Sequence, residues 1–321
     1  SVDIFNKTDK VTSNPCNISI IYPVKVSAGY YHTLVIKNDG TLWGCGDNSN
    51  GQLGIDSQCS FNFVKVFSDV IKTAAGLKHS LILKNDGSLW VCGDNSFGQL
   101  GISNSSQVSR PKLVTENVKN IAAGANHTLV LKQDGILWAC GNNEHGQLGN
   151  GNNEKLSKLD SITNDVKDIA AGETHSLILK NNGTVWSFGN NNRGQLGNGS
   201  YSSSNIPDSV LIYNVDRIES KYYYSFFHKN DGSFWASGDF EGKLDSSMIK
   251  TCHEIPIKIT SDIKFVDVGA PTIGLPASND GLILILKNNG SLHITSAIFL
   301  LNTESILKSD PIAVKVQSIS A

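Results

Sequence analysis

The chain has 321 residues, of which 39% are hydrophobic, 17% are charged and 30 are glycine. This composition is typical of strand-and-turn proteins and excludes a helical bundle. The 27 basic and 29 acidic residues give a net charge of −2, and the basic residues are scattered singly. Direct capture of nucleic acid by a basic face is therefore not expected. No apolar stretch of about 18 residues is present, so no membrane span is expected either.

Four copies of one pattern follow one another in the first two thirds of the chain. They read AGYYHTLVIKNDGTLWGCGDNSNGQLG (28–54), AGLKHSLILKNDGSLWVCGDNSFGQLG (75–101), AGANHTLVLKQDGILWACGNNEHGQLG (123–149) and AGETHSLILKNNGTVWSFGNNNRGQLG (171–197). Their first glycines stand at positions 29, 76, 124 and 172. A repeat of about 48 residues indicates a modular fold in which each unit packs on its neighbours.

Two weaker copies follow. Ser220–Leu244 keeps the pattern but has Tyr224 where the first four copies have His. The last copy, from about Phe265 to Ile294, keeps KNNGSL, lacks Trp and G-Q-L-G, and carries an insertion at Pro271–Asn279. We therefore expect one domain over residues 1–321, with closing strands at 1–21 and 311–321. Its repeat units are expected near 22–62, 63–110, 111–158, 159–206, 207–255 and 256–310.

Each unit contains four short strand patterns. In the third unit the first three are Val118–Ala123, His127–Lys132 and Ile136–Gly141. The N-D-G sequence between the second and third patterns favours a hairpin, because Asn, Asp and Gly tolerate a positive φ. A fourth apolar run follows each variable loop, at Phe63–Phe67, Pro111–Val114, Ile257–Ile259 and Pro311–Val316. Four antiparallel strands per unit at this spacing predict an all-β propeller.

The pattern A-G-x-x-H-[ST]-L…D-G…W-x-x-G-x-N-x-x-G-Q-L-G resembles the RCC1 family over nearly the whole chain. The resemblance implies a seven-bladed propeller. Because six A-G units are present, the seventh blade is expected to form from the two ends, with strands from Ser1–Asn6, Cys16–Ile21 and Pro311–Ala321. Pairing of the first and last strands in one blade would remove a free sheet edge. A six-bladed ring is the alternative.

Several residues that are often catalytic occur once per unit, which indicates a structural role. The histidines are expected to tie one blade to the next by a hydrogen bond from the imidazole to backbone: His32, His79, His127 and His175. The tryptophans on the third strand are expected to fill the gap between neighbouring sheets: Trp43, Trp90, Trp138, Trp186 and Trp235. Cys45, Cys92 and Cys140 alternate with Phe188 and Ser237 in later units, which indicates packing thiols in a reducing compartment. We predict no catalytic residue, no metal site and no cofactor.

Function is expected where the repeat varies, in the two residues between A-G and His. Each pair should lie on a tight turn, and the turns together should form a ring around the central opening. The candidate partner-binding residues are Tyr30, Tyr31, Leu77, Lys78, Asn126, Glu173, Thr174, Tyr222 and Tyr223. Exposed tyrosines are typical of protein-binding hot spots. The alternative is that these tyrosines, with Tyr224 beside them, pack against one another.

The sequence favours a non-catalytic protein-interaction propeller inside the cell, in the cytoplasm or nucleus, as a module of a larger signalling or trafficking protein. The alternative that the resemblance implies is a guanine-nucleotide exchange factor for a small GTPase, since the namesake of the family acts on Ran. That activity is linked in the family to acidic turn residues and an inserted wedge hairpin. Here Glu173 is the one acidic turn residue, and the Trp-to-Gln spacing is 9 in each of the first four units (Trp43–Gln52 in the first).

Overall fold

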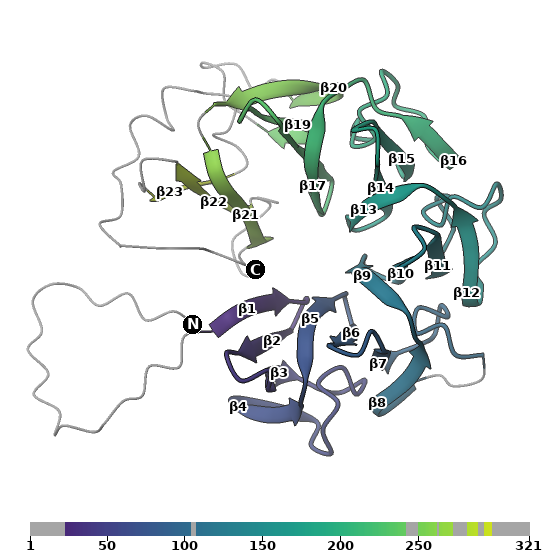
Figure 1. The fold of residues 1–321 in the computed structure, drawn as a ribbon, viewed down its shortest axis with the longest axis vertical. Helices are drawn as coiled ribbons and strands as arrows, with labels where there is room; N and C mark the ends of the chain where they lie inside the picture. Colours follow the sequence, from purple (N-terminus) through teal and green to yellow (C-terminus); the bar gives the residue numbers. More distant parts are fainter. Residues whose placement is uncertain are drawn as a thin grey trace, which may run out of the picture.

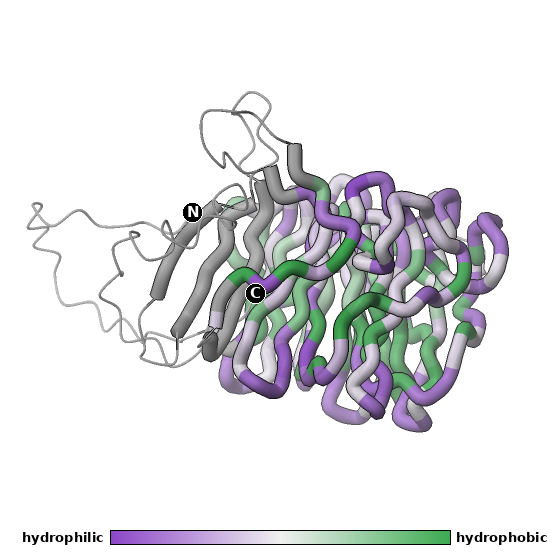
Figure 2. The backbone as a smooth tube through the Cα atoms, turned by 90° about the horizontal axis from the view of Figure 1, so that it is seen from above, coloured by the Kyte–Doolittle hydropathy of each residue, from purple (hydrophilic) through white to green (hydrophobic). Residues whose placement is uncertain are grey.

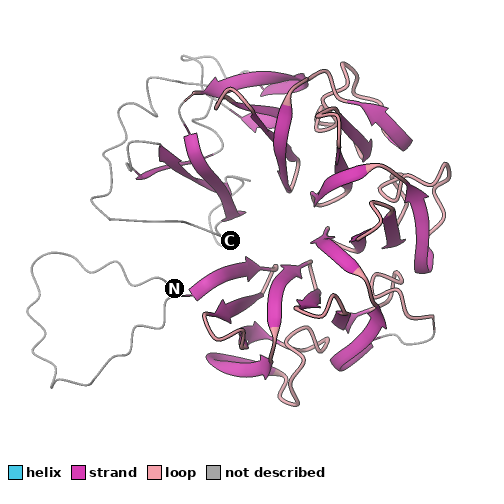
Figure 3. Ribbon diagram, viewed as in Figure 1, coloured by secondary structure: helices cyan, strands magenta, loops and turns pink. Residues whose placement is uncertain are grey.

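The computed structural model describes residues 23–103, 107–241, 250–261, 263–271, 281–287 and 292–296. Every regular element in these ranges is a β-strand (Figure 3). No helix long and apolar enough to cross a membrane occurs in this part of the chain. The strands form five sheets of four strands and one sheet of three, which confirms the predicted all-β architecture of antiparallel blades.

The first three blades lie between residues 23 and 163. The first contains β1 (Pro23–Ala28), β2 (His32–Lys37), β3 (Leu42–Asp47) and β4 (Cys59–Phe67). The second contains β5 (Val70–Ala75), β6 (His79–Lys84), β7 (Leu89–Asp94) and β8 (Gln107–Thr115). The third contains β9 (Val118–Ala123), β10 (His127–Lys132), β11 (Leu137–Gly141) and β12 (Leu156–Thr163).

The other three sheets follow in the same order. The fourth contains β13 (Val166–Ala171), β14 (His175–Lys180), β15 (Val185–Gly189) and β16 (Ser204–Ser209). The fifth contains β17 (Val215–Lys221), β18 (Tyr224–Lys229), β19 (Phe234–Glu241) and β20 (Lys250–Thr260). The sixth contains β21 (Ile263–Pro271), β22 (Gly281–Lys287) and β23 (Leu292–Ser296).

Neighbouring strands within a blade pair antiparallel in sequence order, and the blades are arranged around a central opening (Figure 1). The first strand of each blade, such as β5, β9 and β13, faces this opening. The segments predicted to close the ring, 1–21 and 311–321, lie outside the described residues, as does the predicted insertion over most of its length. The choice between six and seven blades therefore stays a prediction.

Burial explains why each strand has its composition. The second strand of an inner blade is covered on both faces by the neighbouring blades, so β10 (HTLVLK) is buried over its first five residues. The fourth strand lies at the outer edge, and β8 contains only half-buried and exposed residues. Apolar segments therefore lie at mid-height of the ring, and polar turns lie at its two faces (Figure 2).

The predicted unit boundaries fall within the fourth strands of the sheets. Residue 63 lies inside β4 and residue 111 inside β8. The outer strands vary in sequence because much of their surface faces solvent, so the repeat marks their ends poorly. The division of the chain into units stays a prediction.

Candidate functional site: the rim of the A-G-x-x-H turns

The four repeated histidines join neighbouring blades through a hydroxyl group. The Nε2 atom of His32 lies 2.9 Å from Ser80 Oγ of the next blade. The corresponding distances are 3.2 Å for His79 to Thr128, 3.0 Å for His127 to Ser176 and 2.9 Å for His175 to Ser225. Each hydroxyl in turn donates to the carbonyl of the Gln in the preceding blade, as Ser80 does to Gln52 at 2.7 Å. The predicted link between blades is present, but the predicted direct bond from the imidazole to backbone is wrong, because a hydroxyl of the next blade stands between the ring and the carbonyl. We call the four histidines the histidine belt.

The hydrogen bonding of the hydroxyl fixes the imidazole tautomer. Because Ser80 has one hydroxyl proton and gives it to Gln52, the proton between Ser80 and His32 belongs to Nε2. The belt Nδ1 atoms are buried without a hydrogen-bond partner. Burial lowers the pKa of His32 to about 4 and the pKa values of the other three to about 3, so all four rings are neutral.

The glycine of each A-G pair makes room for the belt histidine. A Cβ atom added to Gly124 would lie 2.0 Å from His127 Cε1 and 2.7 Å from the Gly172 carbonyl. Neither the core imidazole nor the backbone of the next blade can move away easily. The A-G dipeptide is therefore a packing requirement of the belt.

The repeated tryptophans fill the space between neighbouring sheets. Trp90 packs against the apolar cluster of the first blade, and Trp138 packs against that of the second. Four of the five indoles donate to a hydroxyl two residues earlier, as Trp43 does to Thr41 at 2.8 Å. Trp138 Nε1 is buried without such a partner, because Ile136 occupies the hydroxyl position.

The repeated thiols lie in the interior to different degrees. Cys92 and Cys140 are fully buried, and Cys45 is half-buried. Burial raises the pKa of the Cys92 thiol to about 12, so it carries no thiolate at neutral pH. Cys59 lies on the outer strand β4 and is exposed. All cysteines in the described ranges are free thiols.

Backbone hydrogen bonds connect the variable turns of the second to fifth blades along one rim. The first variable residue of one turn donates to that of the next, from Leu77 to Ala125 (3.0 Å), Ala125 to Glu173 (3.0 Å) and Glu173 to Tyr222 (2.9 Å). The carbonyl of the second variable residue accepts from the end of the third strand in its own blade. The donors to Tyr31, Lys78, Asn126 and Thr174 are Asp47, Asp94, Asn142 and Asn190, at 2.8–2.9 Å.

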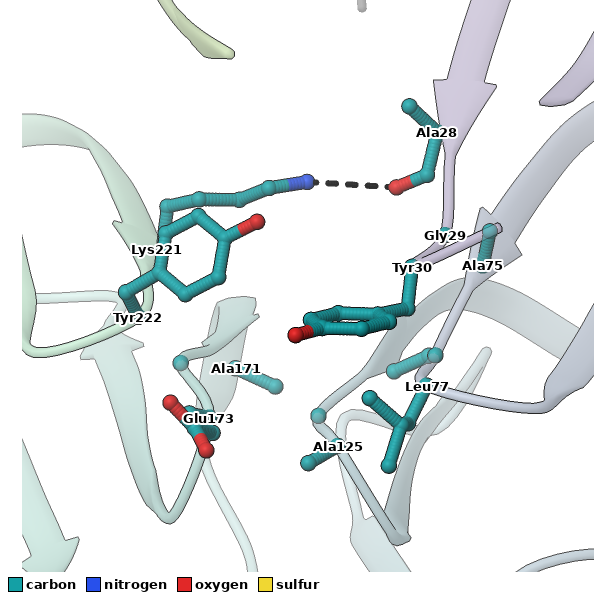
Figure 4. Close-up of a pocket in the computed structure, with 14 residues that line it drawn as sticks. Ala28, Gly29, Tyr30, Ala75, Leu77, Ala125, Ala171, Glu173, Lys221 and Tyr222 are labelled. Atoms are coloured by element: carbon teal, nitrogen blue, oxygen red, sulfur yellow. Dashed lines mark hydrogen bonds between the residues drawn. The ribbon is translucent and has the colours of Figure 1, made fainter. Parts of the chain in front are cut away.

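The predicted partner-binding residues divide into two groups. Tyr30, Leu77, Glu173 and Tyr222, with the A-G residues of the same turns, line one opening, which we call the mouth (Figure 4). The second turn residues lie farther out on the rim: Tyr31, Lys78, Asn126, Thr174 and Tyr223. Tyr30 and Tyr31 are 43% and 51% exposed and pack edge to face, with ring centroids 4.5 Å apart.

Tyr224 does not belong to the rim. It is 5% exposed and its ring lies 6.1 Å from that of Phe226 in the core of the fifth blade. Tyr222 and Tyr223 are half-buried, and Tyr222 has a φ of 49°, in the left-handed region. The rim tyrosines therefore pack against neighbours and also keep exposed surface, and their role in partner binding stays a prediction.

Glu173 supplies negative charge between two tyrosines of the next blade. Burial raises the pKa of Tyr222 to about 12, and the charges of Glu173 and Tyr30 add to this rise. Burial also raises the pKa of Tyr223, with Glu173 contributing by its charge and by a hydrogen bond to the phenol. Both phenols are thus neutral hydrogen-bond donors at physiological pH.

Sequence comparison assigns the fold to a family. A family model described as the RCC1-like domain matches residues 5–275. The chain belongs to the RCC1-like family. An RCC1 domain-containing protein of Dictyostelium discoideum is 50% identical over 36 residues, which cover 11% of this chain and 7% of that relative. The chain thus spans a small part of the relative's length.

Solved structures of RCC1-like propellers share the fold. Human WBSCR16 matches with a TM-score of 0.73 and 20% identity, covering 86% of this chain and 76% of WBSCR16. Prp20p from Saccharomyces cerevisiae, a structure reported with its binding properties to Gsp1p and histones, matches with a TM-score of 0.72 and 21% identity. The match covers 84% of this chain and 71% of Prp20p. At this level of identity the likeness establishes the fold alone.

Below the mouth, the RCC1-like ring has a polar axial channel that the sequence analysis did not identify. Its lining includes one residue from the same register position of several first strands. Lys72 Nζ donates to Asn120 at 2.5 Å, and Asn120 donates to Asp168 at 2.6 Å. Arg217 pairs with Glu219 at 2.6 Å. A polar residue two positions after the first valine of these strands, whose identity changes from blade to blade, was the weak signal available in the sequence.

The lysine that ends the second strand of each of the first five blades was also missed. Lys180 Nζ donates to the Asn164 carbonyl at 2.5 Å and thereby connects its hairpin to the preceding blade. In the first blade Lys37 Nζ lies 3.4 Å from the centre of the Trp43 ring. In the described ranges no group of three or more His, Cys, Asp or Glu side chains is arranged to hold a metal ion.

Proposed function

We propose that this chain is a non-catalytic binding platform whose protein partner docks on the rim of the A-G-x-x-H turns. The observation that carries the proposal is the concentration of tyrosine on one part of this rim, with Tyr30 and Tyr31 about half exposed and Tyr222 and Tyr223 beside Glu173. Tyrosines that combine apolar contact with a phenol donor dominate many protein interfaces.

The roles of the repeated residues support the same proposal. The belt imidazoles, the tryptophans and the buried thiols each have a packing partner within or between blades. A general base must be within reach of solvent and substrate, and the belt rings are at most 2% exposed. The repeat therefore builds the scaffold, and the variable turns are left to select a partner.

The free thiols support a site of action in a reducing compartment, so we place the protein in the cytoplasm or nucleus. We further propose that the propeller acts as one module of a larger signalling or trafficking protein.

The test removes the rim tyrosines and leaves the repeat intact. A variant with Tyr30, Tyr31, Tyr222 and Tyr223 replaced by alanine should lose the proteins that the wild-type chain captures from lysate, as identified by mass spectrometry. A control variant replaces Phe61 and Tyr213, which are 97% and 66% exposed and lie away from the rim, by alanine. Thermal unfolding of all three proteins checks the fold. Unchanged capture by the tyrosine variant would refute the placement on the rim.

A second candidate function is guanine-nucleotide exchange on a small GTPase. The likeness to Prp20p, whose reported binding partner is Gsp1p, favours it. The rim has one acidic residue in the predicted turns, Glu173, and the third-strand loops of the first four blades have no room for an inserted hairpin. Release of a fluorescent nucleotide from a panel of small GTPases tests this function. Acceleration would support exchange, and unchanged release would exclude it for that panel.

A further inference from the structure

Three side chains from different blades converge at the mouth. Tyr30 comes from the first blade, Glu173 from the fourth and Tyr222 from the fifth (Figure 4). The rest of the lining in the described blades comes from alanine and glycine residues of the A-G pairs, with Leu77, Ala125 and Lys221. The mouth therefore has apolar walls of small residues, with two aromatic rings, one carboxylate and one ammonium group among its larger side chains.

The lining of the mouth carries one carboxylate, that of Glu173, and one ammonium group, that of Lys221. The Glu173 carboxylate accepts a hydrogen bond from Tyr223 and forms no ion pair with Lys or Arg in the described ranges. Its charge raises the pKa of Tyr222 beyond the effect of burial. Lys221 also lines the mouth, and its ammonium group is turned toward the Ala28 carbonyl, 3.4 Å away. The faces of the tyrosine rings add the negative side of their quadrupoles.

Aromatic rings elsewhere in this protein already hold cations. Lys37 lies 3.4 Å from the Trp43 ring centre, and Lys229 lies 5.3 Å from that of Trp235. On the rim itself, the Arg193 guanidinium lies 5.5 Å from the Tyr223 ring centre and pairs with Asp239. Cation–aromatic contacts within about 6 Å are favourable. The same chemistry is available at Tyr30, where the ring keeps exposed surface.

We propose that the mouth binds an arginine side chain presented by a protein partner. This inference rests on the proposed function of the rim and names the chemistry of its central contact. The guanidinium plane stacks on Tyr30 beside Tyr222, and its N–H groups donate to Glu173. Arginine fits better than lysine because its planar fork matches a carboxylate and stacks on an aromatic face. An acidic side chain placed against Tyr30 and Tyr222 would be repelled by the Glu173 carboxylate.

A labelled pentapeptide tests the proposal directly. Fluorescein-labelled Gly-Ser-Arg-Ser-Gly is titrated with the full chain, and binding is followed by fluorescence anisotropy. The matched peptide with citrulline keeps the shape and loses the charge, and a third peptide carries glutamate. We expect the arginine peptide to bind at least about tenfold more tightly than the citrulline peptide, a difference of about 1.4 kcal/mol. The glutamate peptide should bind more weakly still.

Two variants locate the site. Glu173→Gln should weaken binding of the arginine peptide about fivefold or more and leave the citrulline peptide unchanged. Glu144→Gln makes the same charge change at an exposed residue outside the mouth and should have no effect. Tyr30→Leu keeps an apolar side chain and removes the aromatic face, so it should also weaken the arginine peptide. Tyr30 is 43% exposed, so this variant is expected to fold.

Several results would overturn the proposal. Equal binding of the arginine and citrulline peptides would do so, and so would unchanged binding of the arginine peptide by Glu173→Gln. A preference for the glutamate peptide would also overturn it and would point to Lys221 as the recognising group. The result of this peptide test can be distinguished from the result of the lysate-capture test of the binding platform. If lysate capture needs the rim tyrosines while arginine has no advantage over citrulline, the platform stands and the arginine site fails. If the arginine peptide binds as expected while capture survives loss of the tyrosines, the platform placement fails.

Discussion

Acid should unfold this propeller through the histidine belt. The belt rings are neutral and buried, with pKa values of about 4 for His32 and about 3 for His79, His127 and His175. In the unfolded chain each would have a pKa near 6.5. A base whose pKa is lower in the folded state than in the unfolded state contributes its full stabilisation at pH values above the unfolded-state pKa. Its contribution is lost as the pH falls from about 6.5 toward the folded pKa.

The size of the effect follows from the number of rings. Each belt histidine reduces the free energy of unfolding by about 1.4 kcal/mol for each pH unit below 6.5. Four rings together remove about 5 kcal/mol for each pH unit. A domain stability of about 5–15 kcal/mol would then be lost between about pH 5.5 and pH 4. Carboxyl groups, with ordinary pKa values near 4, act mainly below this range, whereas His253, whose pKa is lowered mainly by burial, adds to the effect.

Urea unfolding followed by tryptophan fluorescence measures this dependence, at fixed ionic strength from pH 8 to pH 5. The variant His127→Gln with His175→Gln keeps a side-chain N–H donor near each partner hydroxyl and has two fewer titrating rings. Its free energy of unfolding should fall with pH at about half the wild-type slope. His145→Gln alters a half-buried histidine outside the belt and serves as the control. A free energy of unfolding that stays constant from pH 7 to pH 5, or a slope that the double variant does not change, would refute the reasoning.

Three further predictions concern packing. Ile136→Thr should stabilise the protein by about 1 kcal/mol in urea unfolding, because it supplies the hydroxyl that Trp138 Nε1 lacks. Gly124→Ala should destabilise the protein by about 3 kcal/mol or more, because its Cβ would overlap the belt imidazole. Gly232→Ala has no such overlap and should cost only about 1–2 kcal/mol, because its φ of 77° lies in the left-handed region. In native protein a thiol reagent should modify Cys59, while the two fully buried third-strand thiols should react only after denaturation.

Each of these predictions has its own check. Thr184→Val, which removes the corresponding hydroxyl from Trp186, should destabilise the fourth blade, opposite in sign to Ile136→Thr. An equal cost for the two glycine substitutions would contradict the close contact at Gly124. Peptide mapping after limited labelling identifies the modified cysteine. Rapid native labelling of Cys92 or Cys140 would show that the interior of the blades opens readily.

The repeat in the sequence was sufficient to predict the blade because local chemistry and burial agree within it. The third-unit strands Val118–Ala123 and His127–Lys132 match β9 and β10, since glycine turns and apolar runs mark both their ends. The position of the rim also followed from the A-G-x-x-H spacing. The hydroxyl partner of each histidine could not be derived, because it belongs to the next blade and depends on how two sheets meet.

The candidate site was harder to predict from the sequence, because its contacts also join residues of different blades. The approach of Tyr222 to both Glu173 and Tyr30 joins residues from the fifth, fourth and first blades, and it exists only when the ring is assembled. The burial of Tyr224 followed from its place in the repeat, where it occupies the belt position, but its neighbours on the rim suggested a surface role. The channel lining at Lys72, Asn120 and Asp168 was hidden because these side chains differ from blade to blade.

The contrast between constant and variable positions reflects which atoms carry the contact between blades. At the belt, side chains carry it: an imidazole donates to a hydroxyl, so the first four copies all have His followed by Ser or Thr. At the first variable turn position, backbone atoms carry it: the Ala125 amide donates to the Glu173 carbonyl whatever the side chains are. These backbone bonds join the turns of the second to fifth blades and do not depend on the identity of the side chain at that position. Those side chains can change to fit a partner at little cost in stability, which makes the rim the part of this scaffold best suited to recognition.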